Sequence, residues 1–281
     1  MPITIRVKDM HETLVKYLSG LVDSDGSISF NFSEDPRHPK MYRAYLALAI
    51  SASEAVDVHG FIESLPGQTG FGSIDRAQGH NKSTFYVVRW TVRVRAELEM
   101  LLPRLIKHAF VKGKHLQRMF DKWKENRGKL LSSEECDVLK EFAKASRADA
   151  GPVKPKNFPS WGWLGGYMDG NGSFRAGLRK DRGRLSYQAS MHASCHQNDA
   201  MVLEFIQKAH GGYIKPHSAA KNCMVWERNL GKRERSFALA FLPKLVNHAR
   251  LKKHKIEQLI AFHHGHLQRP SEQTSTEEAT V

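Results

Sequence analysis

Apolar residues near the start of the chain are spaced first as in a helix and then as in a strand. Between residues 11 and 22 they follow one helical face, which predicts an amphipathic helix. From residue 27 onward the period is two, and four polar residues alternate with Ile28, Phe30 and Phe32. This alternation predicts a strand with one buried face and one face open to solvent.

Similar changes of period predict the other elements. In the first half we expect a strand at 41–51, a helix from Ser53 to Leu65 that ends at Pro66, a hairpin of strands at 71–77 and 83–94, and helices at 95–109, 112–127 and 133–147. In the second half we expect a helix to about 168, strands near 173–180 and 184–195, a helix at 198–209, strands near 213–217 and 222–229, and helices to about 265.

The two halves share an internal sequence repeat. Residues 18–26 (LSGLVDSDG) return at 164–172 (LGGYMDGNG), so that Asn171 stands 146 positions after Asp25. Further matches follow in order, Phe61-Ile62 with Phe205-Ile206 and Leu102-Pro103 with Leu242-Pro243. A repeat of this kind predicts two similar modules about a pseudo-two-fold axis, with the repeated helices at the axis.

The repeat also divides the chain and suggests how its halves meet. We expect an N-terminal module at 1–147, a linker at 148–160, a C-terminal module at 161–268 and a disordered tail at 269–281. Small residues, Ser19-Gly20 and Gly165-Gly166, would let the two repeated helices approach closely. Their glycine-containing ends would then form one polar centre.

Charge and composition narrow the class of partner. The chain has 43 Lys and Arg against 29 Asp and Glu, a formal charge of +14, which suits a polyanion. Nucleic acid is the leading partner and an anionic membrane surface a distant second. The three cysteines are widely spaced and support neither a disulfide framework nor a zinc ribbon. With no long apolar run and no secretory signal pattern, a soluble intracellular protein is expected.

The first repeat resembles the signature of single-chain, two-motif LAGLIDADG homing endonucleases, through Leu18, Gly20, Leu21, Asp23, Asp25 and Gly26. The resemblance implies an α+β fold of two pseudo-symmetric αββαββα modules. Each module would carry a four-stranded antiparallel, saddle-shaped sheet over double-stranded DNA, and the motif helices would pack at the interface. It also implies a monomer that uses divalent ions, usually Mg²⁺, with Mn²⁺ or Ca²⁺ as alternatives.

The same resemblance makes Asp25 a metal ligand and puts Asn171 in the partner position; whether the backbone at position 24 also binds the ion stays open. Hydrolysing a phosphodiester requires charge neutralisation and an activated water, which hard oxygen ligands holding Mg²⁺ provide. An amide brings no negative charge, so one strand would be cut slowly or not at all. Three interpretations of Asn171 stay open. It is the native residue of an asymmetric site, a substitution for Asp that keeps the DNA intact, or a sign that the second copy has degenerated into a binding module.

Supporting catalytic residues follow from the family pattern. Lys112 and Lys252, 140 positions apart, resemble the lysines that lie near the attacking water. Glu54 and Asn198, 144 positions apart, resemble a polar pair at the start of the middle helix. Simple phosphate contacts by the lysines, and a first-turn helix carboxylate at Glu54, are the alternatives.

DNA recognition is expected from the polar faces of the strands, because an antiparallel ribbon fits the major groove. The candidates are Ser29, Asn31, Ser33, Arg76, Tyr86, Arg89, Arg93, Arg175, Arg179, Gln188, Lys215 and Arg228. The two halves differ chemically, which predicts a long, imperfectly palindromic target. Two other functions stay open: an RNA maturase that assists group I intron splicing, favoured by the weakened second motif, and a non-catalytic DNA-binding protein on the same fold.

Overall fold

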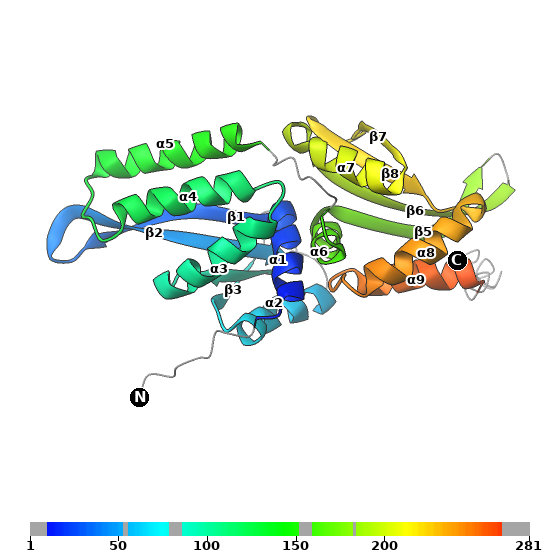
Figure 1. The fold of residues 1–281 in the computed structure, drawn as a ribbon, viewed down its shortest axis with the longest axis horizontal. Helices are drawn as coiled ribbons and strands as arrows, with labels where there is room; N and C mark the ends of the chain where they lie inside the picture. Colours follow the sequence, from blue (N-terminus) through cyan, green and yellow to red (C-terminus); the bar gives the residue numbers. More distant parts are fainter. Residues whose placement is uncertain (1–9, 53–55, 79–85, 152–158, 182–183, 266–281) are drawn as a thin grey trace, which may run out of the picture.

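The structure is a computed structural model of the 281-residue chain, which describes residues 10–52, 56–78, 86–151, 159–181 and 184–265. Two α+β halves lie next to each other along the longest axis (Figure 1). The first contains α1 (Glu12–Asp25), β1 (Gly26–Asp35), β2 (His38–Ala52), α2 (Val56–Thr69), β3 (Ser73–Gln78), β4 (Tyr86–Val92), α3 (Arg95–His108), α4 (Gly113–Asn126) and α5 (Ser133–Ala150).

The second half repeats this order without a described counterpart of α5. Its elements are α6 (Trp161–Asn171), β5 (Gly172–Asp181), β6 (Arg184–His196), the 3₁₀ turn η2 (Gln197–Asp199), α7 (Met201–His210), β7 (Tyr213–Pro216), β8 (Cys223–Asn229), the 3₁₀ turn η3 (Lys232–Glu234), α8 (Arg235–Val246) and α9 (Lys253–His264). The element order predicted from the changes of period is therefore confirmed for the described residues.

Each half builds one antiparallel four-stranded sheet. The strand orders are β1-β2-β4-β3 and β5-β6-β8-β7, so the two sheets have the same topology. Trp90 of β4 and Trp226 of β8 occupy corresponding strands and are fully buried. Their indole N–H groups donate to the Phe71 and Gly211 carbonyls at 2.9 and 2.8 Å. The pseudo-symmetric α+β fold class is confirmed.

The motif helices α1 and α6 pack against each other between the sheets, at the centre of the molecule (Figure 1). A Cβ added to Gly20 would lie 2.0 Å from the Trp163 carbonyl oxygen, and one on Gly166 would lie 2.0 Å from the Tyr17 carbonyl oxygen. Only glycine allows backbones to approach this closely. Gly165 instead faces His248, so one glycine of each motif, not two small residues, makes the close contact.

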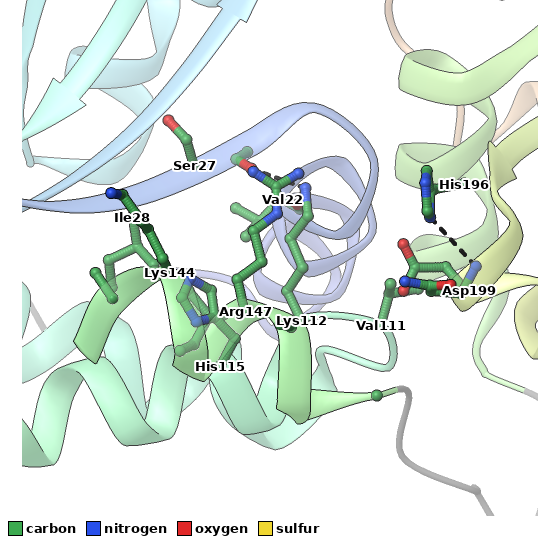
Figure 2. A pocket seen from close by; sticks show the side chains of 16 residues that line it. Val22, Ser27, Ile28, Val111, Lys112, His115, Lys144, Arg147, His196 and Asp199 are labelled. Atoms are coloured by element: carbon green, nitrogen blue, oxygen red, sulfur yellow. Dashed lines mark hydrogen bonds between the residues drawn. The ribbon is translucent and has the colours of Figure 1, made fainter. Parts of the chain in front are cut away.

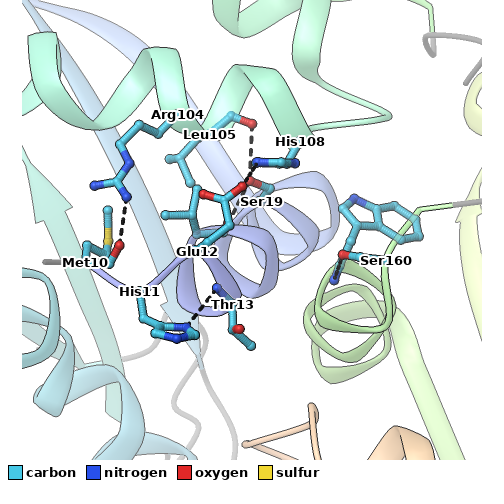
Figure 3. Close-up of polar contacts among 11 residues, drawn as sticks. Met10, His11, Glu12, Thr13, Ser19, Arg104, Leu105, His108 and Ser160 are labelled. Carbon is cyan, nitrogen blue, oxygen red and sulfur yellow. Dashed lines mark hydrogen bonds and ion pairs between the residues drawn. The ribbon is translucent and has the colours of Figure 1, made fainter.

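The start of α1 is fixed to α3 by polar contacts (Figure 3). His108 Nε2 lies 2.7 Å from a Glu12 carboxylate oxygen, and Arg104 donates to the Met10 carbonyl at 2.7 Å. About two turns further along α1, the Ser19 hydroxyl donates to the Leu105 carbonyl at 3.2 Å. These contacts hold α1 against its own module while its glycine face meets α6.

Two helices end later than the sequence predicts. The helix predicted to stop at Pro66 continues to Thr69, because proline removes only its own N–H donor and Gly70 N still donates to the Pro66 carbonyl at 2.8 Å. The helix predicted at 133–147 extends to Ala150. The 83–85 part of the predicted hairpin and the predicted tail at 269–281 lie outside the described residues.

Candidate active site

The C-terminal ends of α1 and α6 meet, so the two motif turns form one polar centre. A Cβ added to Gly170 would lie 1.9 Å from Ser24 Oγ and 2.8 Å from a carboxylate oxygen of Asp25. Gly170 occupies the repeat position of Ser24, and a second serine would collide with the first. Asp25 is exposed and Asn171 half-buried at this junction.

Two residues earlier, each motif carries a buried aspartate that accepts a hydrogen bond from the helix of the other motif. Asp23 accepts hydrogen bonds from Phe110 N at 2.5 Å, Lys112 N at 2.7 Å and the Trp163 indole at 2.8 Å. These donors come from the loop before α4 and from α6. Asp23 therefore joins α4 of its own module to the helix of the other.

Asp169 makes the corresponding contacts on the other side. It accepts from the Tyr17 hydroxyl at 2.8 Å and from the backbone N–H groups of Arg250, Leu251 and Lys252 at 2.6–2.9 Å. Burial raises the pKa of both aspartates, and their N–H donors oppose that rise. With both oxygens occupied inside the protein, Asp169 is not placed to replace the missing carboxylate at position 171.

The two predicted catalytic lysines bind the ends of the motif helices. Lys112 Nζ donates to the carbonyls of Val22, Ser24 and Gly26 at 2.9, 3.0 and 2.8 Å. Lys252 Nζ donates to Gly170 and Gly172 at 2.8 and 2.6 Å. An ammonium has three donors, so Lys112 uses all of them on backbone carbonyls at the end of α1 and the start of β1. Direct contact of either lysine with an attacking water stays a prediction.

A pocket of about 630 Å³ lies beside the end of α1 and is lined by residues of both halves (Figure 2). Lys112 and the predicted site residue Asn198 both line it. Asn198 lies in η2 and is exposed. Glu54, the predicted partner of Asn198, lies outside the described residues.

Most predicted DNA-contacting residues lie on the open face of a sheet. Ser29, Asn31 and Ser33 are exposed, opposite the buried row of Ile28 and Phe30. The strand registers put further candidates on the open faces, namely Arg89, Arg175, Gln188 and Lys215. Two basic candidates are paired, Arg93 with Asp75 at 3.0 Å and Lys215 with Glu227.

Two predicted DNA contacts are on the opposite, helix-covered side. Arg76 pairs with Glu63 of α2 at 2.7 Å. Arg228 donates to the His210 carbonyl at 2.8 Å, pairs with Glu234 at 2.6 Å and stacks 4.0 Å over Phe237. Arg76 lies on the same side of its strand as the half-buried Ile74, and Arg228 on the same side as the buried Trp226, so their assignment to the open face is corrected. Tyr86 and Arg179 lie in β4 and β5, and their side chains are outside the described part of the chain.

Other residues of the open faces were not predicted from the sequence. His192 and Glu227 are cross-strand partners on the second sheet, and Tyr213 is 45% exposed opposite Glu227. On the first sheet, Tyr45 stands opposite Asn31. Tyr45 alternates with the buried Leu46 and His192 with the buried Met191, so period-two counting along their own strands would have placed both on the open faces.

The donor set at the motif ends fits a hard divalent ion. Asp25 offers an exposed carboxylate, and Asn171 an amide oxygen on the adjoining helix end. Mg²⁺ is often held by one or two carboxylates, with waters and substrate phosphates completing its shell. No cluster of three or more His, Cys, Asp or Glu with metal-site geometry occurs in the described ranges, so phosphate oxygens would have to contribute.

Comparison with known proteins finds similarity in structure but not in sequence. Neither protein-family models nor curated protein sequences match the chain. The LAGLIDADG homing endonuclease I-SmaMI bound to cleaved DNA matches with a TM-score of 0.63 at 17% identity, over 89% of this chain and 88% of its own. I-GzeII in complex with its DNA target matches with 0.66 at 14%, over 92% and 94%. The meganuclease I-AabMI bound to uncleaved DNA matches with 0.65 at 16%, over 89% and 90%.

The chain therefore has the fold of single-chain LAGLIDADG homing endonucleases. This agrees with the resemblance carried by the first motif. Within the described ranges, no helix has both the length and the apolar character that crossing a bilayer requires.

Proposed function

We propose that the chain is a site-specific, divalent-metal-dependent endonuclease that cuts double-stranded DNA as a monomer. The observation that carries this proposal is the meeting of Asp25 with the end of the second motif, between two open antiparallel sheets. The net charge of +14 supports a polyanionic partner. The three structures of similar fold compared above contain DNA, which supports the same partner.

In this proposal the protein positions oxygen ligands and holds them rigid. A divalent ion bound at the motif ends would neutralise charge on the phosphate and lower the pKa of a bound water. Asp25 would hold it through a carboxylate and Asn171 through an amide oxygen. Lys112 and Lys252 donate to the backbone carbonyls on either side of Asp25 and Asn171. They would thereby hold the backbone that carries the two ligands in a fixed position.

Unequal ligands predict unequal cutting of the two strands. A carboxylate gives the ion a full charge and an amide only a dipole, so the strand served mainly by Asp25 should be cut faster. Asn171→Asp should accelerate the slower strand and leave the recognised sequence unchanged. Single-turnover assays with a different end label on each strand measure both rates. Equal rates in the unmodified protein would show that the Asn171 amide does not slow cleavage of its strand.

A strong salt dependence of DNA binding is also expected. Each phosphate contact that displaces a counterion contributes roughly 0.9 to the slope of log affinity against log salt. Basic residues on both halves should therefore give a slope that corresponds to several contacts. Titrations of a duplex at increasing NaCl concentration measure it. A flat dependence would count against DNA as the partner.

Selection of cleaved sites tests the proposed activity as a whole. A randomised duplex library incubated with Mg²⁺ and the protein should yield cut sites that share a long, imperfect palindrome. Asn171→Asp is run in parallel, because it restores a second carboxylate. If neither protein enriches any cut sequence, the nuclease proposal fails.

The second candidate is a non-catalytic DNA-binding protein, which Asn171 favours specifically. Its open sheet faces would remain useful for recognition after one ligand was lost. The two candidates differ in one result: selection by binding enriches a site in both cases, whereas selection by cleavage enriches a site only for the nuclease.

A further inference from the structure

The pocket beside the end of α1 contains a basic residue that neither motif supplies. Its lining includes Arg147 and Lys144 of α5, Lys112 and His115 at the start of α4, and His196 and Asp199 from the second half. Figure 2 shows the Arg147 and Lys112 side chains extending together toward the end of α1 near Val22, with Asp199 on the other side. Helix α5, the last helix before the second half, thus adds the guanidinium of Arg147 to the edge of the candidate active site.

Basic side chains outnumber carboxylates in the lining of this pocket. Arg147 is exposed and makes no hydrogen bond or ion pair with another described residue, whereas Lys144 is paired with Glu141 at 2.6 Å. Lys112 has its donors on carbonyl groups. Burial, followed by repulsion from the nearby Arg147, lowers the pKa of Lys112, and the charges of Asp23 and Asp199 oppose this shift. Burial, followed by the charges of Arg147 and Lys112, lowers the pKa of His115 to about 4, which keeps this ring neutral. Asp199 is the one carboxylate in the lining, and it lies across the pocket.

The pocket continues toward the surfaces expected to face DNA. Ser27 belongs to the open row of β1 that continues through Ser29 and Asn31, and His196 ends the strand that carries Gln188. Gly26, which follows Asp25, also lines it. An anion in the pocket would therefore be close to the candidate active site and next to both sheets.

We propose that this pocket binds one backbone phosphate of the DNA duplex, with the Arg147 guanidinium as its principal donor. The planar fork of arginine suits two phosphate oxygens, and an anion would relieve the repulsion between Arg147 and Lys112. The second half has no described helix equivalent to α5, so this contact would serve only the side of the centre that Lys112 supports. The inference rests on the proposed DNA-binding function and adds a phosphate contact from the helix that joins the modules.

The test compares three single variants of the full chain in duplex-binding titrations over a range of NaCl concentrations. Arg147→Gln should weaken binding and lower the slope of log affinity against log salt by about 0.9, the contribution of one phosphate contact. Arg147→Lys keeps the charge and should keep the slope. Lys140→Gln is the matched control, because Lys140 lies on α5, outside the pocket lining, and is paired with Asp137 at 2.7 Å. It should behave like the unmodified protein.

The possible results separate this inference from the proposed function. If the unmodified protein binds duplex and Arg147→Gln has the same slope, the phosphate site is wrong and the endonuclease proposal stands. If Lys140→Gln lowers the slope as much as Arg147→Gln, the effect is one of general charge and the inference also fails. If no protein binds duplex, the proposed function itself is wrong. Thermal unfolding of each variant checks that the exposed substitutions leave the fold intact.

Discussion

Asp25→Asn should abolish cleavage of the target duplex and change its affinity by less than about tenfold, because the phosphate and base contacts that we propose for the sheets are separate from the motif turns. Among the described residues, the substitution removes the one exposed carboxylate at the junction of α1 and α6, since Asp23 and Asp169 are buried and accept hydrogen bonds inside the protein. Cleavage and equilibrium binding of the selected duplex are measured on the same preparation.

The control for this substitution is Asp121→Asn. Asp121 is an exposed residue of α4 that accepts a hydrogen bond from Gln117, so its loss changes the net charge equally at a place away from the junction. It should cut at the normal rate. A loss of DNA binding as complete as the loss of cleavage in Asp25→Asn would show that Asp25 does more than hold an ion.

Gly166→Ala should destabilise the protein by about 3 kcal/mol or more, because overpacking of a rigid contact is costly and neither backbone can move aside alone. The added Cβ would lie 2.0 Å from the Tyr17 carbonyl oxygen, 2.8 Å from Leu21 N and 2.9 Å from the Tyr17 carbonyl carbon. All three are backbone atoms of α1. The motif helices would have to separate, and the Asp25 junction would separate with them.

Gly60→Ala in α2 is the matched control, since a Cβ there meets nothing within 4 Å. Alanine favours helix over glycine by roughly 0.5–1 kcal/mol, so this variant should be as stable as the unmodified protein or slightly more stable. Urea unfolding followed by circular dichroism gives both differences. Equal stability of the two variants would contradict the close packing of α1 against α6.

The internal repeat made the architecture predictable from sequence. The 146-residue offset between Asp25 and Asn171 identifies the two helix ends that meet, and the glycines at 20 and 166 mark the close contact. Period-two alternation in 27–33 gave the open face of β1 correctly. These features are local, or are repeated at a fixed distance, and each has a direct physical meaning.

The parts that sequence did not predict depend on contacts between distant residues. Lys112 and Lys252 were predicted from a resemblance, but their contacts with the ends of the motif helices depend on loops that return 80–90 residues later. Arg147 is basic like many other residues of the chain, and only the course of α5 brings it to the pocket. The face of Arg228 was predictable in principle, because it stands two residues after the buried Trp226.

The position of the cuts within the protected DNA tests the central claim most directly. The claim is that one cleavage centre lies where α1 and α6 end, between two sheets that each bind half of the target. Footprinting of the bound duplex, combined with mapping of the cut on each strand, gives this position. The account predicts cuts at the middle of the footprint, with a protected half-site on either side. Cuts at one end of the footprint, or outside it, would contradict it.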